Sequence, residues 1–462
     1  MQQAIRNRVR RHVDSLRHDP EQLFAGLLDP TWVEQALARE HVRWRDCIFT
    51  PMVTLWAFLS QVLCPDHSCR AVVARLIARL VARGEAPCTP ETGPYCKARQ
   101  RLPVGVLSSL TRRTGQVSEG LAPADWGWKG RRVLLVDGTT VSMPDTEANQ
   151  HGFPQLAVQK PGLGFPLARL VAVISLATGT VRDLALGPAK GKQTGETALF
   201  RTLWDRLDRG DIILGDCTFA SYFGIAPLVE RGVDVLSRTH QRRKVDFRRG
   251  LRLGVTDHVV RWPKPERPDW MDEATYDRLP DHVEVRELRV RVEQAGFRVD
   301  ELVLVTTLLD PGEFSKEEVA AQFFQRWNIE LDLRSIKVEM QMEVLRCKTP
   351  EMVEKEVWAH LLAYNLVRAR MARAAEGHET EPRRLSFKGA MQTMRAFAEV
   401  VGSSGPCRRA ELEEELLRAI ATHRVGDRPD RVEPRAKKRR PKPHRLLTVP
   451  RHEARKRLLH RA

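Results

Sequence analysis

The sequence predicts an α/β protein in which helices flank a mixed sheet, with a helical N-terminal region and a mainly β insertion. Three patterns predict this class. The apolar runs VLLV (133–136) and IIL (212–214) have the length and β-branched content of buried strands. Most of residues 1–125 follow helical periodicity. VEVRELRVRV (283–292) alternates apolar and charged residues with period 2, as a half-exposed strand does.

Charge is unevenly distributed along the 462 residues, whose formal net charge is +17. Residues 431–462 hold thirteen Lys or Arg against two Glu. A basic tail of this kind is typical of arms that bind nucleic acid, although a solvated tail without a partner has the same composition. AKKRRPKPHR (436–445) also has the composition of a localisation signal, but nothing else in the sequence supports that reading.

Several classes of protein are disfavoured. No run of 18 apolar residues occurs, so we expect no membrane span, and the first residues lack the apolar segment of a signal peptide. Eight scattered cysteines do not form a disulfide framework, which indicates a reducing, cytoplasmic compartment.

Two motifs are rejected on their spacing. CPDHSC (64–69) with Cys88 and Cys96 lacks the two close ligand pairs of a zinc site. GPAKGKQTGE (187–196) fails the phosphate-loop pattern, with Gln193 in the Ser/Thr place.

The N-terminal region, residues 1–125, is predicted to be helical. Residues 1–16 form a short basic amphipathic pattern, and SCRAVVARLIARLVARG predicts a helix that stops at Gly84. Arg75, Arg79 and Arg83 share one face of that helix. A DNA-facing stripe and an ordinary solvated face are equally compatible with this spacing.

The central region is divided by its change of pattern. Residues 126–240 read as a strand, a hairpin around Thr178–Gly179, a helix from Thr194 to Gly210, and then strands alternating with a helix. Residues 241–300 form the β-rich insertion. The sheet resumes over residues 301–375, and helices fill 376–430 before the basic tail, 431–462.

A charged stripe is predicted on the helix QRWNIELDLRSIK (325–337). Helical spacing places Phe323, Arg326, Glu330 and Lys337 along one line about 20 Å long. Ile329, Leu333, Ile336 and Met340 form the adjacent stripe and are the expected buried face. The alternative to a functional line is a set of weak surface ion pairs.

Three carboxylates become a site if the fold brings them together. Asp137 and Asp216 each follow a buried strand, and Glu330 lies on the helix. Carboxylate oxygens suit hard divalent cations, and two such ions serve in-line phosphodiester chemistry. Arg326 and Lys337 would then pair with phosphate oxygens. The alternatives are a turn-opening Asp at 137 and a helix N-cap at 216.

The segments VDGTTVSMPDTEANQ, GDIILGDCTFASY and FQRWNIELDLRSIK together resemble the DDE transposases of bacterial insertion sequences, specifically the insertion-sequence-4 type. The last segment matches the Tyr-x2-Arg-x3-Glu-x6-Lys signature at Arg326, Glu330 and Lys337, with Phe323 in the Tyr place. The hydroxyl lost at Phe323 is either dispensable or removes a DNA backbone contact. The resemblance covers roughly residues 130–375.

The resemblance implies an RNase H-like core of five mixed strands in a bacterial, nucleoid-associated enzyme. It implies that Asp137, Asp216 and Glu330 hold two Mg²⁺ ions, for which Mn²⁺ substitutes. The partners would be double-stranded DNA, at the transposon ends and the target, and a second copy of the chain in a synaptic homodimer. The reaction would cut at terminal inverted repeats and join the 3′-OH ends to target DNA.

Further DNA contacts are expected from three residues outside the signature. Arg238 follows a strand and would contact DNA, or lie on the surface. Trp262 and Trp270, in the insertion, would hold a base displaced by an end hairpin, or pack within the insertion. Two other functions are compatible with the same sequence features. One is a nuclease that cuts DNA without joining it, and the other is a regulator, derived from a transposase, that binds DNA without cutting it.

Overall fold

The computed structural model describes residues 27–44, 47–82, 84–292, 300–426 and 446–460. The chain divides into two compact units. We call the first the helical unit; it contains residues up to 127, 177–183 and 332–425. We call the second the sheet unit; it contains residues 128–176, 184–331 and those from 426 onward. Residues 177–183 and 332–425 belong to the helical unit, although they lie between segments of the sheet unit in the sequence. Each unit is therefore assembled from several separate segments of the chain.

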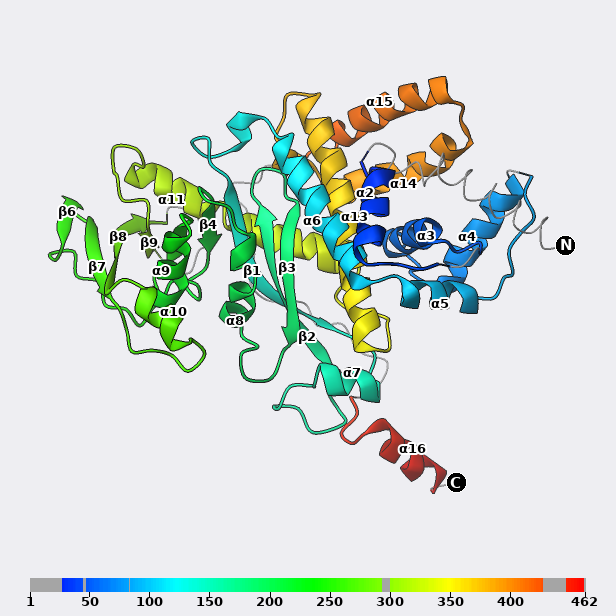
Figure 1. The fold of residues 1–462 in the computed structure, drawn as a ribbon, viewed down its shortest axis with the longest axis horizontal. Helices are drawn as coiled ribbons and strands as arrows, with labels where there is room; N and C mark the ends of the chain where they lie inside the picture. Colours follow the sequence, from blue (N-terminus) through cyan, green and yellow to red (C-terminus); the bar gives the residue numbers. More distant parts are fainter. Residues whose placement is uncertain (1–26, 45–46, 83, 293–299, 427–445, 461–462) are drawn as a thin grey trace. The chain divides into compact units, whose positions relative to one another are not determined.

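A nine-stranded mixed sheet dominates the fold, in the order β3-β2-β1-β4-β5-β9-β8-β7-β6 (Figure 1). β1 runs parallel to β4, which runs parallel to β5, while β1 and β2 are antiparallel. The predicted mixed sheet is therefore confirmed. The strands are β1 (Val133–Ser142), β2 (Leu167–Ser175), β3 (Val181–Pro188), β4 (Ile212–Gly215), β5 (Asp234–Arg238), β6 (Leu251–Gly254), β7 (Asp257–Pro263), β8 (His282–Arg291) and β9 (Glu301–Thr306).

The β-rich insertion is hydrogen-bonded to this sheet. β9 pairs antiparallel with β5, β8 with β9, and β7 with both β8 and β6. A short helix, α10 (Glu273–Arg278), lies between β7 and β8. The insertion strands thus extend the ladder of the core strands.

The core of the sheet unit comes from alternate strand positions. Leu134 and Val136 of β1 and Ile213 of β4 are buried in one cluster. α8 (Glu196–Arg201) and α9 (Tyr222–Glu230) contribute apolar residues to it. The predicted helix from Thr194 to Gly210 is too long, because α8 ends at Arg201 and only a 3₁₀ turn, Trp204–Arg206, follows.

The helical unit is built round α13 (Pro350–Glu376), which is buried along most of its length. The Asn365 side chain is fully satisfied: its oxygen accepts from Val181 N, and its amide donates to Thr111 O and Val181 O. The other helices are α2 (Pro30–Arg39), α3 (Pro51–Leu63), α4 (Cys69–Ala82), α5 (Gly93–Arg101), α6 (Val104–Gly120), α14 (Phe387–Ser403) and α15 (Pro406–Thr422). The predicted helical N-terminal region is therefore confirmed over its described part.

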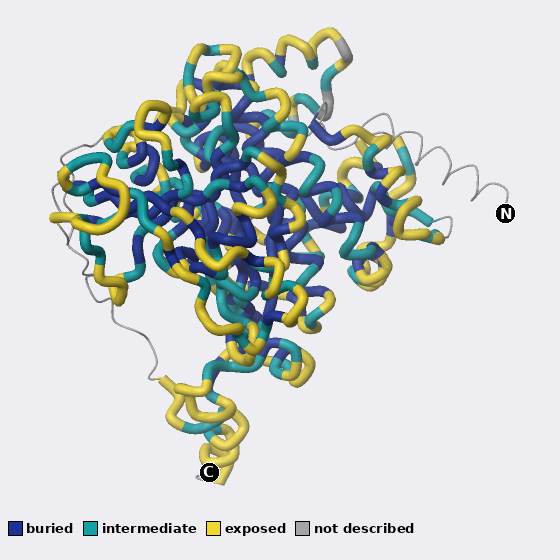
Figure 2. The backbone as a smooth tube through the Cα atoms, turned by 60° about the vertical axis from the view of Figure 1, so that its left-hand side comes forward, coloured by how far each residue is buried: buried dark blue, intermediate teal, exposed yellow. Residues whose placement is uncertain are grey.

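The ends of the chain are only partly described. The predicted amphipathic segment, residues 1–16, and AKKRRPKPHR (436–445) lie outside the described residues. Within the tail, α16 (Arg451–Leu459) is a helix with an exposed surface (Figure 2). In the part of the chain that the structure describes, no helix is both long and apolar enough to span a membrane.

Candidate active site

Asp137 and Asp216 lie side by side on neighbouring parallel strands. Leu135 of β1 pairs with Leu214 of β4, and each aspartate comes two residues later. β4 ends at Gly215, whereas β1 continues to Ser142, so the expectation that Asp137 ends its strand is wrong. Asp137 instead marks the point where β1 runs beyond its parallel partner.

Neither aspartate caps a helix. The Asp137 carboxylate accepts a hydrogen bond from Gly138 N at 2.8 Å. Asp216 accepts from Thr218 N at 2.7 Å and thereby shapes the turn after β4. Ser221 is the N-cap of α9, and its hydroxyl accepts from Gly224 N. One oxygen of each aspartate thus accepts a hydrogen bond from a nearby backbone amide.

Burial raises the pKa of Asp137 to about 6. The Gly138 amide and the Arg326 guanidinium oppose this shift, while the nearby Asp216 and Glu196 carboxylates add to it. Carboxylates that lie close together without enough compensating positive charge hold protons more tightly. The site therefore has an excess of negative charge, which favours the binding of cations.

Glu330 is joined to Asp137 through Arg326. Arg326 Nη2 donates to Glu330 Oε1 at 3.0 Å, and Arg326 Nη1 lies 3.7 Å from Asp137 Oδ2. Glu330 is on α12 (Trp327–Arg334), and Arg326 lies in the turn that precedes it. A guanidinium thus occupies the space between two of the three predicted carboxylates.

The predicted single helix over residues 323–337 is wrong. α11 (Lys316–Phe324) ends with a turn at Gln325, α12 follows, and residues Ser335–Glu339 form a π-helical turn. A π turn contains an extra residue, so the 20 Å stripe calculated from α-helical spacing does not exist. The expected buried face is confirmed, since Ile329, Leu333, Ile336 and Met340 are all buried.

Lys337 and Phe323 lie in different elements from Glu330. Lys337 is in the π-helical turn, which belongs to the helical unit. Phe323 is buried at the end of α11, with its ring centre 6.2 Å from that of Phe324. A buried position suits the apolar ring that replaces the tyrosine of the signature.

The structure brings Arg238 to the same sheet edge. Ser237 of β5 pairs with Gly215 of β4, so Arg238 comes level with Asp216. Burial raises the pKa of Cys217, which follows Asp216, and both Arg238 and Arg326 act to lower it. Two guanidinium groups therefore lie near the end of β4.

Glu196 is a fourth carboxylate that the sequence interpretation missed. It is the first residue of α8, and its carboxyl carbon occupies the space beside Gly138: a Cβ on Gly138 would lie 2.4 Å from Glu196 Cδ. Glu196 is also one of the groups that raise the pKa of Asp137. Gly138, directly after Asp137, could have indicated this neighbour in the sequence, since a glycine inside a strand often marks a close approach by another group.

Trp262 and Trp270 are packed within the sheet unit. Trp262, in β7, is 2% exposed; its indole N–H donates to Glu287 Oε1 at 2.9 Å, and the Arg243 guanidinium lies 3.6 Å from its ring centre. Trp270 is half-buried; its ring contacts Phe223, and the Arg201 guanidinium lies 3.7 Å from its ring centre. Trp270 is the more accessible of the two rings.

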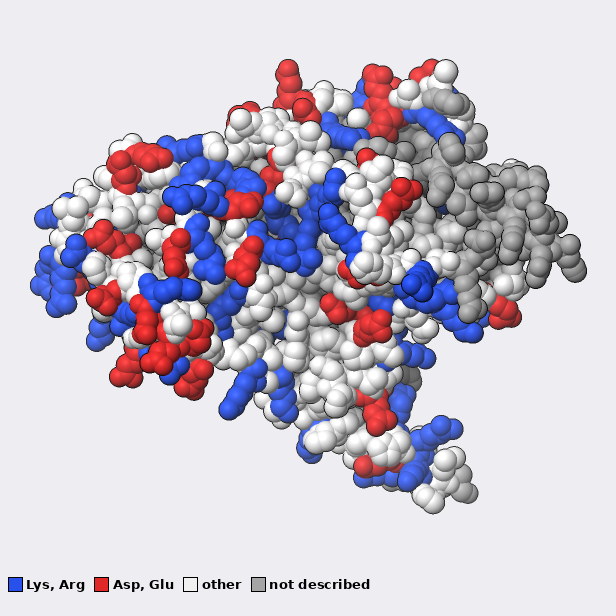
Figure 3. Space-filling model, in the orientation of Figure 1, with Lys and Arg blue, Asp and Glu red and all other residues white. Residues whose placement is uncertain are grey.

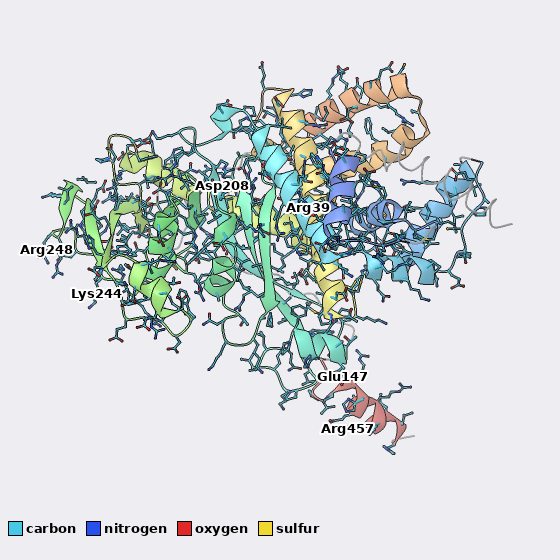
Figure 4. All side chains as sticks on the ribbon, viewed as in Figure 1. Arg39, Glu147, Asp208, Lys244, Arg248 and Arg457 are labelled. Atoms are coloured by element: carbon cyan, nitrogen blue, oxygen red, sulfur yellow. The ribbon has the colours of Figure 1, made fainter. Side chains whose placement is uncertain are left out.

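Exposed basic side chains gather before and along β6. We call them the basic rim (Figures 3 and 4); Asp246 pairs with two of them, Arg248 and Arg249. The rim consists of Arg242, Arg243, Lys244, Arg248, Arg249 and Arg252. A surface of this charge fits a polyanion.

As arranged, no three His, Cys, Asp or Glu side chains among the described residues stand close enough to hold a metal ion. The donors at the site are nevertheless all carboxylate oxygens, which are the ligands that Mg²⁺ and Mn²⁺ prefer. The residues present therefore fit a divalent cation once the guanidinium leaves.

The mixed sheet, with carboxylates near the ends of two of its neighbouring strands, agrees with the class of DNA-acting enzymes that the sequence resembles. Residues 128–366 match the family model described as the transposase DDE domain. The chain belongs to this family and is a DDE transposase, an enzyme that acts on DNA. The resemblance to the insertion-sequence-4 type is confirmed.

The chain is also similar to individual proteins. The chain is similar to transposase InsG for insertion sequence element IS4 of Escherichia coli strain K12, with 28% identity over 442 residues, 93% of this chain and 94% of the relative. It is also similar to the transposase for insertion sequence element IS421 of Escherichia coli, with 38% identity over 65 residues, 14% and 18% of the two chains. Among solved structures, the piggyBac transposase synaptic complex with hairpin DNA matches at 9% identity with a TM-score of 0.43, covering 88% of this chain and 86% of that one.

Proposed function

We propose that this transposase cuts DNA at the terminal inverted repeats of an insertion sequence and joins the freed 3′-OH ends to target DNA. The observation that carries the proposal is that Asp137 and Asp216 each follow, by two residues, the paired Leu135 and Leu214 of parallel strands, with Glu330 linked to Asp137 through Arg326. Family membership supports the reaction class. The assignment of these three residues to it is our inference.

Asp137, Asp216 and Glu330 would hold Mg²⁺ or Mn²⁺ through carboxylate oxygens. When bound there, two such ions would supply activation of the attacking oxygen and stabilisation of the leaving one in an in-line displacement. Arg326 neutralises two of these carboxylates in the metal-free protein and becomes available to a phosphate group when cations replace it. Arg238, level with Asp216, supplies a second guanidinium for the DNA backbone. Lys337 is proposed as a further phosphate contact.

Glu196 extends this donor set. Its carboxylate beside Gly138 and its effect on the pKa of Asp137 place it near the proposed ions. We assign Glu196 a positioning role. Its negative charge raises the pKa of Asp137, and a bound cation would offset this repulsion. This role is independent of whether Glu196 itself touches an ion.

The DNA would be held by surfaces beyond the carboxylates. The basic rim and the exposed cations of α16 have the charge required to contact phosphates (Figure 4). We propose double-stranded transposon ends and target DNA as partners, a homodimer in the synaptic complex, and a location in the bacterial cytoplasm with the nucleoid. Of the two tryptophans, Trp270 is the better candidate for stacking on a displaced base, because the Trp262 indole already has a buried partner.

The test is cleavage of labelled transposon-end DNA by the full-length protein with and without Mg²⁺ or Mn²⁺. Asp137→Asn, Asp216→Asn and Glu330→Gln are each expected to abolish cutting while DNA binding survives. Glu317→Gln, at an exposed position on α11, is the matched control and should cut normally. Cutting that persists in a variant removes that residue from the site. Cutting without joining would establish a nuclease, and binding without cutting under any metal would favour the regulator.

A further inference from the structure

Two cysteines of the helical unit face each other across a short gap. Cys69 is the first residue of α4, and Cys96 is the fourth residue of α5. Their Sγ atoms are 3.7 Å apart, and both residues are half-buried. A disulfide requires about 2.05 Å between the sulfur atoms. A small rotation of the two side chains at this helix junction would close the remaining gap.

A buried guanidinium lies against both sulfurs. Arg99, 8% exposed, points Nη2 at Cys69 Sγ, 3.2 Å away, and at Cys96 Sγ, 3.9 Å away. Its Nη1 donates to Gln61 Oε1 at 3.2 Å, and its buried Nε has no hydrogen-bond acceptor within the described chain. The cation therefore points toward the thiols and is only partly satisfied by neutral groups.

The acidic groups that act on Arg99 are unusual. Burial acts to lower the pKa of Arg99, yet the pKa is raised overall by the Tyr95 phenol and the thiols of Cys69, Cys347 and Cys96. A carboxylate is absent from this group of residues. The guanidinium carbon of Arg99 also lies 5.1 Å from the ring centre of Phe58 and 5.0 Å from that of Tyr95. Its Nη2 atom is the part of the cation that contacts the two thiols.

We propose that Cys69 and Cys96 form an oxidation-sensitive dithiol that closes to a reversible disulfide between α4 and α5, with hydrogen peroxide as the oxidant. The Cys96 thiolate attacks one peroxide oxygen, the O–O bond breaks, and the departing hydroxide takes up a proton to become water. The resulting sulfenic acid is attacked by Cys69 sulfur, which forms the S–S bond and releases the second oxygen as water. Two thiols lose two electrons, and one peroxide becomes two waters.

The order of attack follows from burial. Burial raises the pKa of Cys69, against the opposing effect of Arg99, and we therefore assign Cys69 the role of the resolving thiol. Closure moves the sulfurs from the positions in which they contact Arg99, so we expect glutathione to reduce the disulfide readily.

A metal site does not explain the same cysteines. Cys64, the third cysteine of this region, is occupied by Arg75, whose Nη1 lies 2.5 Å from Cys64 Sγ. The described residues offer no group of three metal ligands here. Cationic neighbours repel a metal ion, whereas they favour a thiolate.

The test oxidises reduced full-length protein with one equivalent of hydrogen peroxide, blocks the remaining thiols with N-ethylmaleimide, and analyses the digest by mass spectrometry. We expect a cross-linked peptide pair joined through Cys69 and Cys96, two hydrogen atoms lighter than the separate peptides and lost on addition of glutathione. Cys69→Ser and Cys96→Ser should each lose it, and Cys407→Ser, on exposed α15, should keep it. Full labelling of both cysteines after peroxide, or oxidation of each without a cross-link, overturns the proposal.

The role of Arg99 is tested separately by the pH dependence of Cys69 alkylation in the Cys96→Ser background. Arg99→Gln should move the midpoint of the alkylation rate to higher pH, and Arg99→Lys should move it less. An unchanged profile in Arg99→Gln refutes the positioning role. If Arg99→Gln does not fold, as judged by circular dichroism, the cross-link in the Arg99-containing protein still decides the main proposal.

Discussion

Arg326 Nη1 lies 3.7 Å from Asp137 Oδ2, so a residue from the turn before α12 reaches the carboxylate of the central strand β1. The same guanidinium donates to Glu330 at 3.0 Å. In the metal-free protein Arg326 therefore provides the positive charge that divalent ions would provide in the proposed reaction. Binding of cations to the carboxylates would then release Arg326, and the freed guanidinium could contact DNA.

Arg326→Gln should lower the stability of the metal-free protein, because Asp137 and Glu330 lose their shared cation. We expect a loss of about 1–2 kcal/mol, which is the range for a hydrogen bond to a charged group. Added Mg²⁺ should stabilise this variant more than the unmodified protein. Thermal unfolding with and without Mg²⁺ measures both effects, and Arg334→Gln, an exposed position on α12, is the control. Equal melting temperatures for Arg326→Gln and the unmodified protein would contradict the coupling.

Asp137 predicts a definite dependence of stability on pH. Its pKa is raised by burial from 3.8 to about 6, so the folded state binds the proton more tightly than the unfolded chain. Metal-free stability should fall as pH rises from about 4 to about 6 and then level off. Asp137→Asn removes this penalty and should be more stable by about 2 kcal/mol at pH 7, but not at pH 3.5. Urea unfolding across this pH range checks the sign, and a constant difference would exclude Asp137 as its source.

Gly138→Ala tests the position of Glu196. A Cβ at residue 138 would lie 2.4 Å from Glu196 Cδ, so the glutamate must move. Cleavage should drop at least tenfold, and Glu196→Ala should relieve the steric conflict in the double variant. We expect the two stability effects to be strongly non-additive in a double-mutant cycle. Additive effects would show that the two residues do not interact.

Trp262→Phe should destabilise the sheet unit. Glu287 would lose the indole N–H at 2.9 Å inside a buried site, which costs about 1–3 kcal/mol. Trp270→Phe leaves no buried acceptor of this kind and should change stability by less. If either ring stacks on a displaced base, 2-aminopurine fluorescence at the transposon end will detect it. A base-stacking defect in Trp262→Phe without a loss of stability would reverse our ranking of the two residues.

Deleting residues 431–462 should weaken DNA binding and reduce its dependence on salt. Each phosphate contact that is lost lowers the slope of log K against log [salt] by about 0.9. Binding measured at several salt concentrations gives the slope, and neutralising only Arg451, Arg455 and Lys456 separates α16 from the rest of the tail. An unchanged slope would mean that the tail does not touch DNA.

The sequence predicted the mixed sheet and the buried face of the glutamate helix, because these follow from local periodicity and from where apolar runs end. It did not predict the break at Gln325 or the π turn at Ser335, where tertiary packing overrides helical spacing. It did not reveal Glu196 either, whose proximity to Gly138 depends on how α8 follows β3.

The burial of charged residues in β8 was not predicted from the sequence either. β8 alternates in sequence like a half-exposed strand, yet Arg286 and Glu287 are both buried. Arg286 is held by Asp257, with contacts of 2.8 and 2.5 Å, and by Phe314 O. Glu287 accepts from Trp262 and contacts His258 Nε2 at 3.0 Å. Period 2 identifies the two faces of a strand but not the loops and side chains that later cover them.

The continuous ladder from β5 through β9 to β6 determines how the chain can be shortened. Removing β6, β7 and β8 would not free an independent module, because it would turn β9 into an open edge with unpaired amide and carbonyl groups. Such an edge invites the strands of other molecules, so the shortened protein should self-associate. Hydrogen exchange should likewise protect β8 and β9 together with β5, as one cooperative opening unit.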